Sequence, residues 1–114
     1  MSLERILQLL KSLGFSRVEA EVYVYLAKTG PTKAKDLKIG LRMTKQQLYP
    51  ALLGLKKKRI VTSRPERTAL FSALTFEELL NRYVKTNLDQ AEIIKETKEE
   101  LLANWKNMDI QNSA

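Results

Sequence analysis

The sequence predicts a mainly α-helical fold that holds one small β-hairpin and ends in a long helix. Three observations predict it. Capping boxes, in which Ser or Thr is followed three residues later by Glu or Gln, begin at Ser16, Thr44 and Thr75. Apolar residues recur at helical spacing in five segments. Two short β-prone runs, residues 60–63 and 69–74, flank a segment that contains proline.

Composition places the chain of 114 residues among ordinary globular proteins and excludes several kinds of chemistry. Hydrophobic residues make up 44% and charged residues 29%, which is too apolar for a disordered chain. The chain has no Cys and no His, which excludes disulfides, Cys or His metal centres and catalysis by thiol or imidazole. It also has no Gly-rich phosphate loop and no paired-carboxylate motif. We therefore expect neither an enzyme nor a bound cofactor or metal.

The sequence also predicts where in the cell the protein is found. No apolar run approaches the roughly 20 residues of a membrane helix, so we expect no membrane partner. Residues 1–10 mix Glu4, Arg5 and Gln8 into a helical pattern, which is not the pattern of a secretory leader. We therefore expect a cytoplasmic protein.

The first two helices are predicted from caps and apolar spacing. Ser2 is the expected cap of a helix that Gly14 ends. Ser16 and Glu19 form the capping box of the next helix, which ends at a Gly-Pro dipeptide. The expected apolar faces comprise Leu3, Ile6, Leu7, Leu10 and Leu13 in the first helix and Val18, Val22, Tyr25 and Leu26 in the second.

Two more helices precede the β-prone runs. Thr32 is the expected cap of a short third helix that contains Leu37, and Gly40 interrupts its end. Thr44 begins the fourth helix, and Pro50 inside it predicts a kink. The expected buried side of the fourth helix comprises Leu48, Leu52 and Leu55, and the opposite side comprises Gln46, Tyr49, Pro50, Leu53 and Lys57.

Helices followed by a hairpin whose turn holds Arg64 and Arg67 form the order of a winged helix-turn-helix. In that module a short helix and a tight link present the start of a second helix to the DNA major groove, and the hairpin lays cations along the flanking backbone. The helix at residues 45–58 is the candidate second helix, here called the reader helix. Charge supports this interpretation, because residues 1–74 carry 15 Lys and Arg against five Asp and Glu, a net charge of +10, whereas residues 75–114 carry −3.

The candidate base contacts lie in the first turn of the reader helix. Gln pairs with adenine through two hydrogen bonds, and Lys pairs with guanine. Gln47 also has a simpler interpretation as the capping partner of Thr44, and Lys45 as a solvated cation. The candidate DNA-binding residues are Thr44, Lys45, Gln46, Gln47, Tyr49, Lys57, Arg64 and Arg67.

Several motifs in order carry a resemblance to a known family. They are Leu-Gly-Phe-Ser at 13–16, Tyr-Val-Tyr-Leu at 23–26, the Gly-Pro turn that opens 30–37, Leu-Tyr-Pro-Ala-Leu at 48–52, and the segment 55–61. Together they resemble the TrmB-type transcriptional regulators, which are mostly archaeal winged-helix proteins, over roughly residues 8–80. The resemblance implies that the Gly-Pro turn begins the helix-turn-helix and that Lys45, Gln46 and Tyr49 contact the major groove. The hairpin of such a module is called the wing, and the resemblance matches Arg64 and Arg67 to the wing by position alone.

The sequence departs from that family in three places. Family members usually have Gly at the position of Arg59, where the chain leaves the reader helix. The Leu-Tyr-Pro string with Pro50 instead looks like PadR-type regulators, which are also winged-helix repressors. Larger relatives carry a C-terminal sugar-sensing domain, whereas this sequence ends after its long helix, so no small-molecule effector is expected.

The C-terminal segment is predicted to be one helix from Thr75 to about Met108, about 50 Å long at 1.5 Å per residue. Heptad spacing gives it an apolar seam with polar interruptions at Asn87 and Lys98, which is typical of helices that pair. We therefore expect a homodimer. The alternative is that the first half packs on the head domain and the remainder is solvated. The candidate dimerisation residues are Leu80, Val84, Asn87, Ala91, Ile94, Leu101 and Trp105.

The sequence thus predicts a winged helix-turn-helix DNA-binding domain over residues 1–74, a dimerisation helix over 75–108 and a frayed tail over 109–114. The expected function is that of a transcriptional regulator that binds double-stranded DNA sequence-specifically as a homodimer. Two alternatives stay open. One is a dimeric winged-helix adaptor that binds proteins, and the other is a protein that binds DNA or chromatin without sequence preference.

Overall fold

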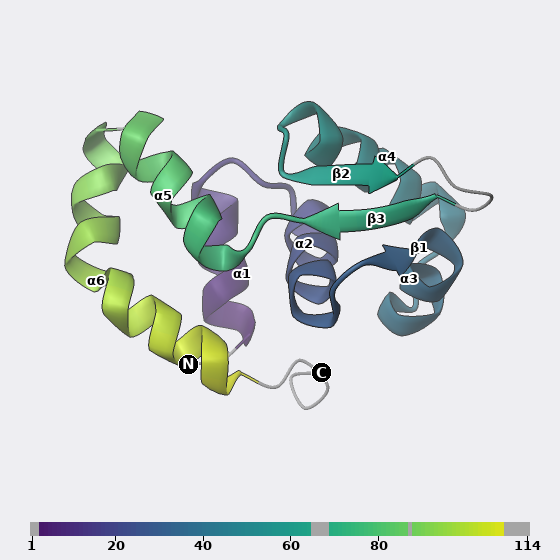
Figure 1. Ribbon diagram of the computed structural model, residues 1–114, viewed down its shortest axis with the longest axis horizontal. Helices are drawn as coiled ribbons and strands as arrows, with labels where there is room; N and C mark the ends of the chain where they lie inside the picture. The colour runs from purple at the N-terminus through teal and green to yellow at the C-terminus, as the bar shows by residue number, and fades with distance from the viewer. Residues whose placement is uncertain (1–2, 65–68, 87, 109–114) are drawn as a thin grey trace. The chain divides into compact units, whose positions relative to one another are not determined.

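The computed structural model describes residues 3–64, 69–86 and 88–108, with side chains for those outside 84–97 (Figure 1). Contacts divide the chain into two compact units, one of residues 6–73 and one of residues 74–114 with 1–5. The predictions for Ser2, Arg67, Asn87 and the tail fall outside the described residues. The elements are α1 (Leu3–Ser12), α2 (Arg17–Thr29), β1 (Thr32–Lys33), α3 (Ala34–Leu41), α4 (Lys45–Lys57), β2 (Val61–Arg64), β3 (Leu70–Ala73), α5 (Phe76–Thr86) and α6 (Leu88–Asn107).

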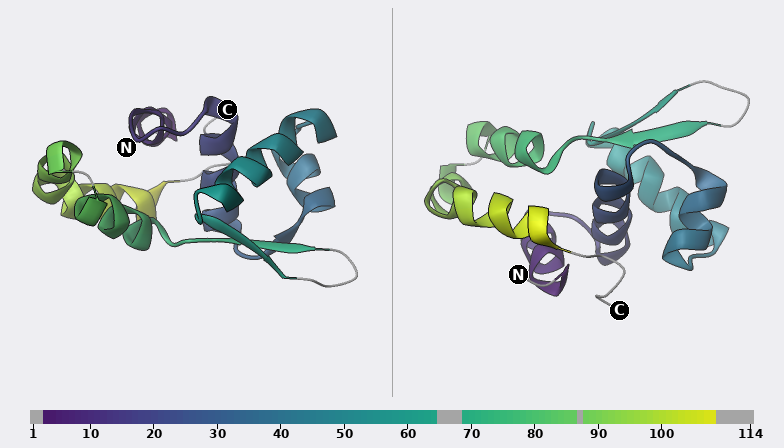
Figure 2. Two further views of the ribbon diagram at one scale, coloured as in Figure 1. Left: turned by 90° about the horizontal axis from the view of Figure 1, so that it is seen from above. Right: turned by 60° about the horizontal axis from the view of Figure 1, so that its bottom comes forward.

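The predicted fold class is confirmed, because the described chain is mostly helical and holds a small antiparallel sheet. The predicted hairpin is β2 and β3, in which Thr62 pairs with Ser72. A third strand, β1, was not predicted from the sequence, and it pairs with the other side of β3 to give the order β1-β3-β2. The strands lie on one side of helices α2, α3 and α4 (Figure 2). This arrangement is a winged helix-turn-helix.

Helix α2 lies at the centre of the unit formed by residues 6–73, where it contacts α3, α4 and β3. Its capping box is formed as predicted, because the Ser16 hydroxyl accepts from the Glu19 N–H and the Glu19 carboxylate accepts from the Ser16 N–H. Tyr23, which the apolar pattern did not select, is fully buried, whereas Tyr25 is only half-buried. The fully buried side chains of α2, α3 and α4 also include Leu26, Leu37, Leu48 and Leu55.

Three helices of this unit end in the same backbone motif. In each, a residue with left-handed backbone follows the helix, and the next N–H bonds to a carbonyl five residues earlier. Gly14 holds this position after α1, Arg42 after α3 and Arg59 after α4, with φ of 105°, 55° and 59°. At the end of α4, Ile60 N–H donates to the Leu55 carbonyl at 3.0 Å. Arg59 therefore adopts the conformation that glycine usually supplies there.

Two predictions for α3 are wrong. Thr32 does not cap the helix, because it lies in β1, and its hydroxyl donates to the Gly30 carbonyl at 2.7 Å. The cap position is held by Lys33, which makes no capping hydrogen bond. Gly40 does not interrupt α3 but lies inside it, where a Cβ atom would collide with the Tyr25 ring and hydroxyl. The glycine allows close packing of α2 and α3.

The single helix predicted over residues 75–108 is wrong, because the chain forms two helices that pack against each other, α5 and α6. Phe76 at the start of α5 stacks on Trp105 near the end of α6, with ring centroids 4.5 Å apart. Lys98 donates to the Asn81 side-chain oxygen at 2.8 Å. Folding back buries apolar side chains within the chain that one extended helix would leave exposed to water.

The folded-back helices change the surroundings of the predicted dimerisation residues. Leu80 and Leu101 are buried, and Trp105 is half-buried against Phe76. The side chains of Val84, Ala91 and Ile94 lie outside the described set.

None of the described helices combines the length and the apolar character that crossing a lipid bilayer demands.

Candidate DNA-binding surface

The reader helix α4 begins with a complete capping box. The Thr44 hydroxyl accepts from the Gln47 N–H at 3.2 Å, and the Gln47 side-chain oxygen accepts from the Thr44 N–H at 2.9 Å. Gln47 is thus engaged in the cap, and this bond holds its carboxamide at the helix start. Lys45 and Gln46, the other two predicted residues of the first turn, are exposed.

The two sides of α4 differ as the sequence predicts. Leu48, Leu52 and Leu55 are buried in the core. On the opposite side Tyr49 is 40% exposed and Leu53 is 55% exposed. Tyr49 and Leu53 are four residues apart and are therefore neighbours on that exposed side.

Lys45 and Tyr49 lie on successive turns of α4 and form a pair. The Lys45 ammonium lies 5.6 Å from the centre of the Tyr49 ring, within range of a cation–π interaction. The helix runs without interruption from Lys45 to Lys57, although it contains Pro50.

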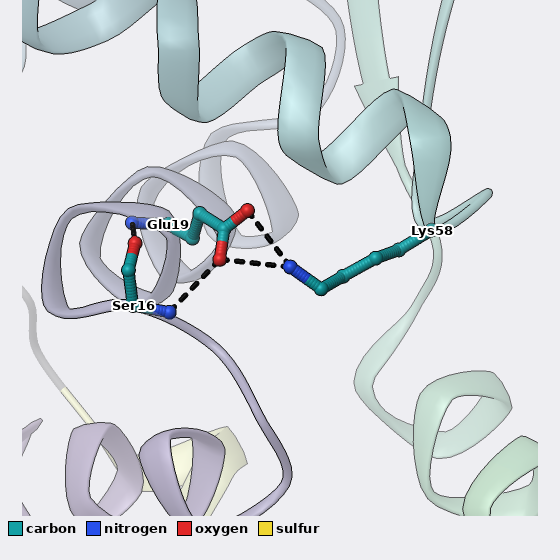
Figure 3. A network of polar contacts seen from close by, with 3 residues as sticks. All are labelled: Ser16, Glu19 and Lys58. Carbon is teal, nitrogen blue, oxygen red and sulfur yellow. Dashed lines mark hydrogen bonds and ion pairs between the residues drawn. The ribbon is translucent and has the colours of Figure 1, made fainter.

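A polar network fastens the far end of α4 to α2 (Figure 3). The Lys58 ammonium donates to both carboxylate oxygens of Glu19, each at 2.9 Å. Glu19 therefore serves two helices at once, as the capping partner of Ser16 in α2 and as the anion that binds Lys58. Gly54 packs close to this carboxylate, because a Cβ atom there would collide with it.

The network keeps Glu19 ionised although it is buried. Burial alone would raise the pKa of Glu19, but the hydrogen bonds from the Ser16 backbone and from Lys58 outweigh it. The pKa of Glu19 consequently lies below its ordinary value. The charge of Lys58 thus has a partner inside the protein, in addition to its favourable place near the end of a helix.

No local sequence pattern signals this network. Ser16 and Glu19 are recognisable as a capping box, and Lys58 as one of four cations at the end of α4. The ion pair joins residues 39 positions apart, so only the packing of α2 against α4 brings them together.

The predicted DNA-binding residues are distributed along the unit of residues 6–73. Arg64 is exposed at the end of β2, where it pairs with Leu70 of β3. Lys57 is exposed in the last turn of α4, about 18 Å along the helix from Lys45 at 1.5 Å per residue. The structure thus brings Thr44, Lys45, Gln46, Gln47 and Tyr49 together at one end of α4 and places Lys57 at the other.

No curated protein matches the chain. The family model described as "Sugar-specific transcriptional regulator TrmB" matches residues 10–77, which contain α2, the reader helix and the whole sheet. Because the match spans more than half of the chain, and because the matched segment folds as a winged helix-turn-helix, the protein belongs to the TrmB family of transcriptional regulators.

Proposed function

We propose that the protein binds double-stranded DNA sequence-specifically, with α4 in the major groove and the β2–β3 hairpin along the backbone. The observation that carries this proposal is the division of α4. Its apolar side is buried, its start is fixed by a capping box, and Lys45 and Gln46 project from the first turn into solvent. Side chains at a helix start reach base edges when the helix end enters the groove.

Each residue of the surface has a distinct proposed role. Gln46 reads adenine and Lys45 reads guanine, because these side chains match the hydrogen-bonding edges of those bases. Tyr49 packs against sugar and phosphate. Thr44 and Gln47 bond to each other, so their role is to orient the first turn. Lys57, Arg64 and Arg67 supply charge to the backbone.

The proposal includes a homodimer, in which two reader helices meet two half-sites of one duplex. Leu102 and Trp105 support it, because both are half-exposed on α6 and line an open groove of about 580 Å³ together with Phe76. A second copy of the chain would cover these side chains. This differs from the sequence-based seam, in which Leu80 and Leu101 face the partner.

Sedimentation analysis tests the dimer. We expect the wild-type protein to be dimeric at micromolar concentration and the Leu102→Glu variant to be monomeric. Gln8→Glu adds the same charge to an exposed site on α1 and serves as the control. A monomeric wild-type protein would remove the homodimer from the proposal.

Selection of bound sequences from a random duplex pool, at two salt concentrations, tests DNA reading. We expect an enriched sequence and an affinity that falls steeply with salt, because phosphate contacts release counterions. Enrichment of no sequence would indicate a protein that coats DNA, and absence of binding would indicate an adaptor. Both outcomes overturn the proposal.

Single variants then separate the roles. Gln46→Ala is expected to relax the base preference at one base pair by about 1–3 kcal/mol. Arg64→Ala is expected to weaken binding to all DNA sequences alike. Gln8→Ala removes an exposed glutamine from α1 and is the control for Gln46→Ala. An unchanged preference in Gln46→Ala would remove Gln46 from the site.

A further inference from the structure

The register of the sheet brings two cations from distant parts of the sequence into one row. Leu70 of β3 pairs with Lys33 of β1 on one side and with Arg64 of β2 on the other. Residues directly opposite one another in antiparallel strands share a face of the sheet. With strands about 4.8 Å apart, the Lys33 and Arg64 backbones are about 10 Å apart.

This row faces away from the core. Phe71, the residue after Leu70 in β3, is buried, and successive side chains of a strand point to opposite faces. Lys33 and Arg64 are both exposed, as that alternation requires. The wing surface therefore includes a cation from β1, the strand that the sequence did not predict.

Lys33 also belongs to an open groove of about 610 Å³ beside the reader helix. Three lysines and one carboxylate line it, so its charge is positive. Tyr49 of α4 forms part of its wall, and the Lys45 ammonium lies over the ring of that tyrosine. The lining residues are Lys33, Ala34, Lys35, Asp36, Lys38, Tyr49, Ala69 and Phe71.

The three lysines have no structural task within the described residues. Helix α3 packs through Leu37, which is fully buried, while Lys35 is exposed and Lys38 half-exposed. No ion pair or hydrogen bond joins the Lys33, Lys35 or Lys38 side chain to another group in the part of the chain that the structure describes. Like charges beside one groove repel one another, and a polyanion in the groove relieves that repulsion.

We propose that this groove binds the DNA backbone, with Lys33, Lys35 and Lys38 contacting successive phosphates between the reader helix and the wing. The inference rests on the proposed function, because it requires that α4 enters a major groove. A duplex held there presents one strand of phosphates beside α4. The groove lies on that flank, since it shares Tyr49 with the reader surface and Lys33 with the row that includes Arg64.

The salt dependence of binding measures such contacts one at a time. Each phosphate contact contributes about 0.9 to the slope of log affinity against log salt. We expect Lys33→Gln, Lys35→Gln and Lys38→Gln each to lower the magnitude of that slope on the selected duplex by about 1 for every bound protomer, and so by about 2 for a dimer. Lys11→Gln, which removes one exposed charge from α1, is the matched control and is expected to leave the slope unchanged.

The preferred sequence provides the second readout, because backbone contacts carry no base information. We expect the three groove variants to select the same sequence as the wild-type protein. Slopes equal to that of Lys11→Gln, or a changed preferred sequence, would overturn the inference.

These outcomes are distinguishable from failure of the proposed function. Suppose that the wild-type protein selects a sequence and that Gln46→Ala relaxes this base preference. If the groove variants then have the same salt slope as the control, only the inference fails. If the wild-type protein binds no duplex, the inference and the proposed function fail together.

Discussion

The Lys58 ammonium binds both carboxylate oxygens of Glu19, each at 2.9 Å, and so joins the end of the reader helix to the start of α2. The same carboxylate accepts from the Ser16 N–H at 2.8 Å. One buried anion thus fixes both a helix start and the packing of two helices. The network orients α4 without contacting its exposed side.

Glu19→Gln is expected to destabilise the protein by about 1–2 kcal/mol at neutral pH. Charged hydrogen bonds contribute about 1.5–3 kcal/mol, and the partial exposure of Lys58 reduces that figure. Chemical denaturation at pH 7 measures the change. Glu21→Gln, which removes a more exposed carboxylate paired with Arg17, is the control and is expected to cost less than about 0.5 kcal/mol.

The same network predicts a pH dependence. The pKa of Glu19 is lowered in the folded protein, so the stabilisation is complete above the ordinary glutamate value of 4.5. It is lost as pH falls below that value through the lower folded pKa. The free energy of unfolding, measured from pH 7 to acid, is therefore expected to fall less steeply with decreasing pH for Glu19→Gln than for the wild-type protein. Parallel curves would contradict the assigned pKa shift.

Gly54→Ala is expected to destabilise the wild-type protein although alanine favours a helix by about 1 kcal/mol over glycine. The new Cβ atom would collide with the Glu19 carboxylate, which Lys58 and Ser16 hold in place. In a Glu19→Ala background the obstacle is absent, and the same change is expected to stabilise. A double-mutant cycle measures this reversal of sign. Additive effects would show that Glu19 does not determine the need for glycine.

Arg59→Gly is expected to stabilise the protein by about 1 kcal/mol. Arg59 has a φ of 59°, and a left-handed backbone costs a residue with a Cβ atom about 1–2 kcal/mol relative to glycine. Arg59→Ala keeps that cost and removes the side chain, so it separates the two contributions. Thermal unfolding compares the three proteins. A glycine variant no more stable than the alanine variant would contradict the conformational explanation.

Spin labels test the folded-back arrangement of α5 and α6. The chain has no native Cys, so Glu77→Cys with Ala103→Cys gives one defined pair of labels within each chain, at exposed positions. Packed helices lie about 10 Å apart, so we expect a label distance of about 10–20 Å. One continuous helix would separate these positions by about 40 Å. A distance near that larger value would contradict the folded-back arrangement.

Features that depend on neighbours three to five residues apart could be predicted from the sequence. Capping boxes begin α2 and α4, and Gly14 ends α1, because each is an interaction between nearby backbone and side-chain groups. The apolar spacing of α4 predicted which of its sides is buried, because helix geometry fixes that periodicity.

Features whose partners are far apart in the chain depend on tertiary packing and could not be predicted in this way. Strand β1 has two residues and exists because β3 offers an unpaired side. Helix α6 packs back against α5, which stacks Trp105 on Phe76 and buries Leu80 and Leu101. Contacts of this kind leave no periodic trace in the sequence, since burial against a distant partner outweighs the local preference to continue a helix.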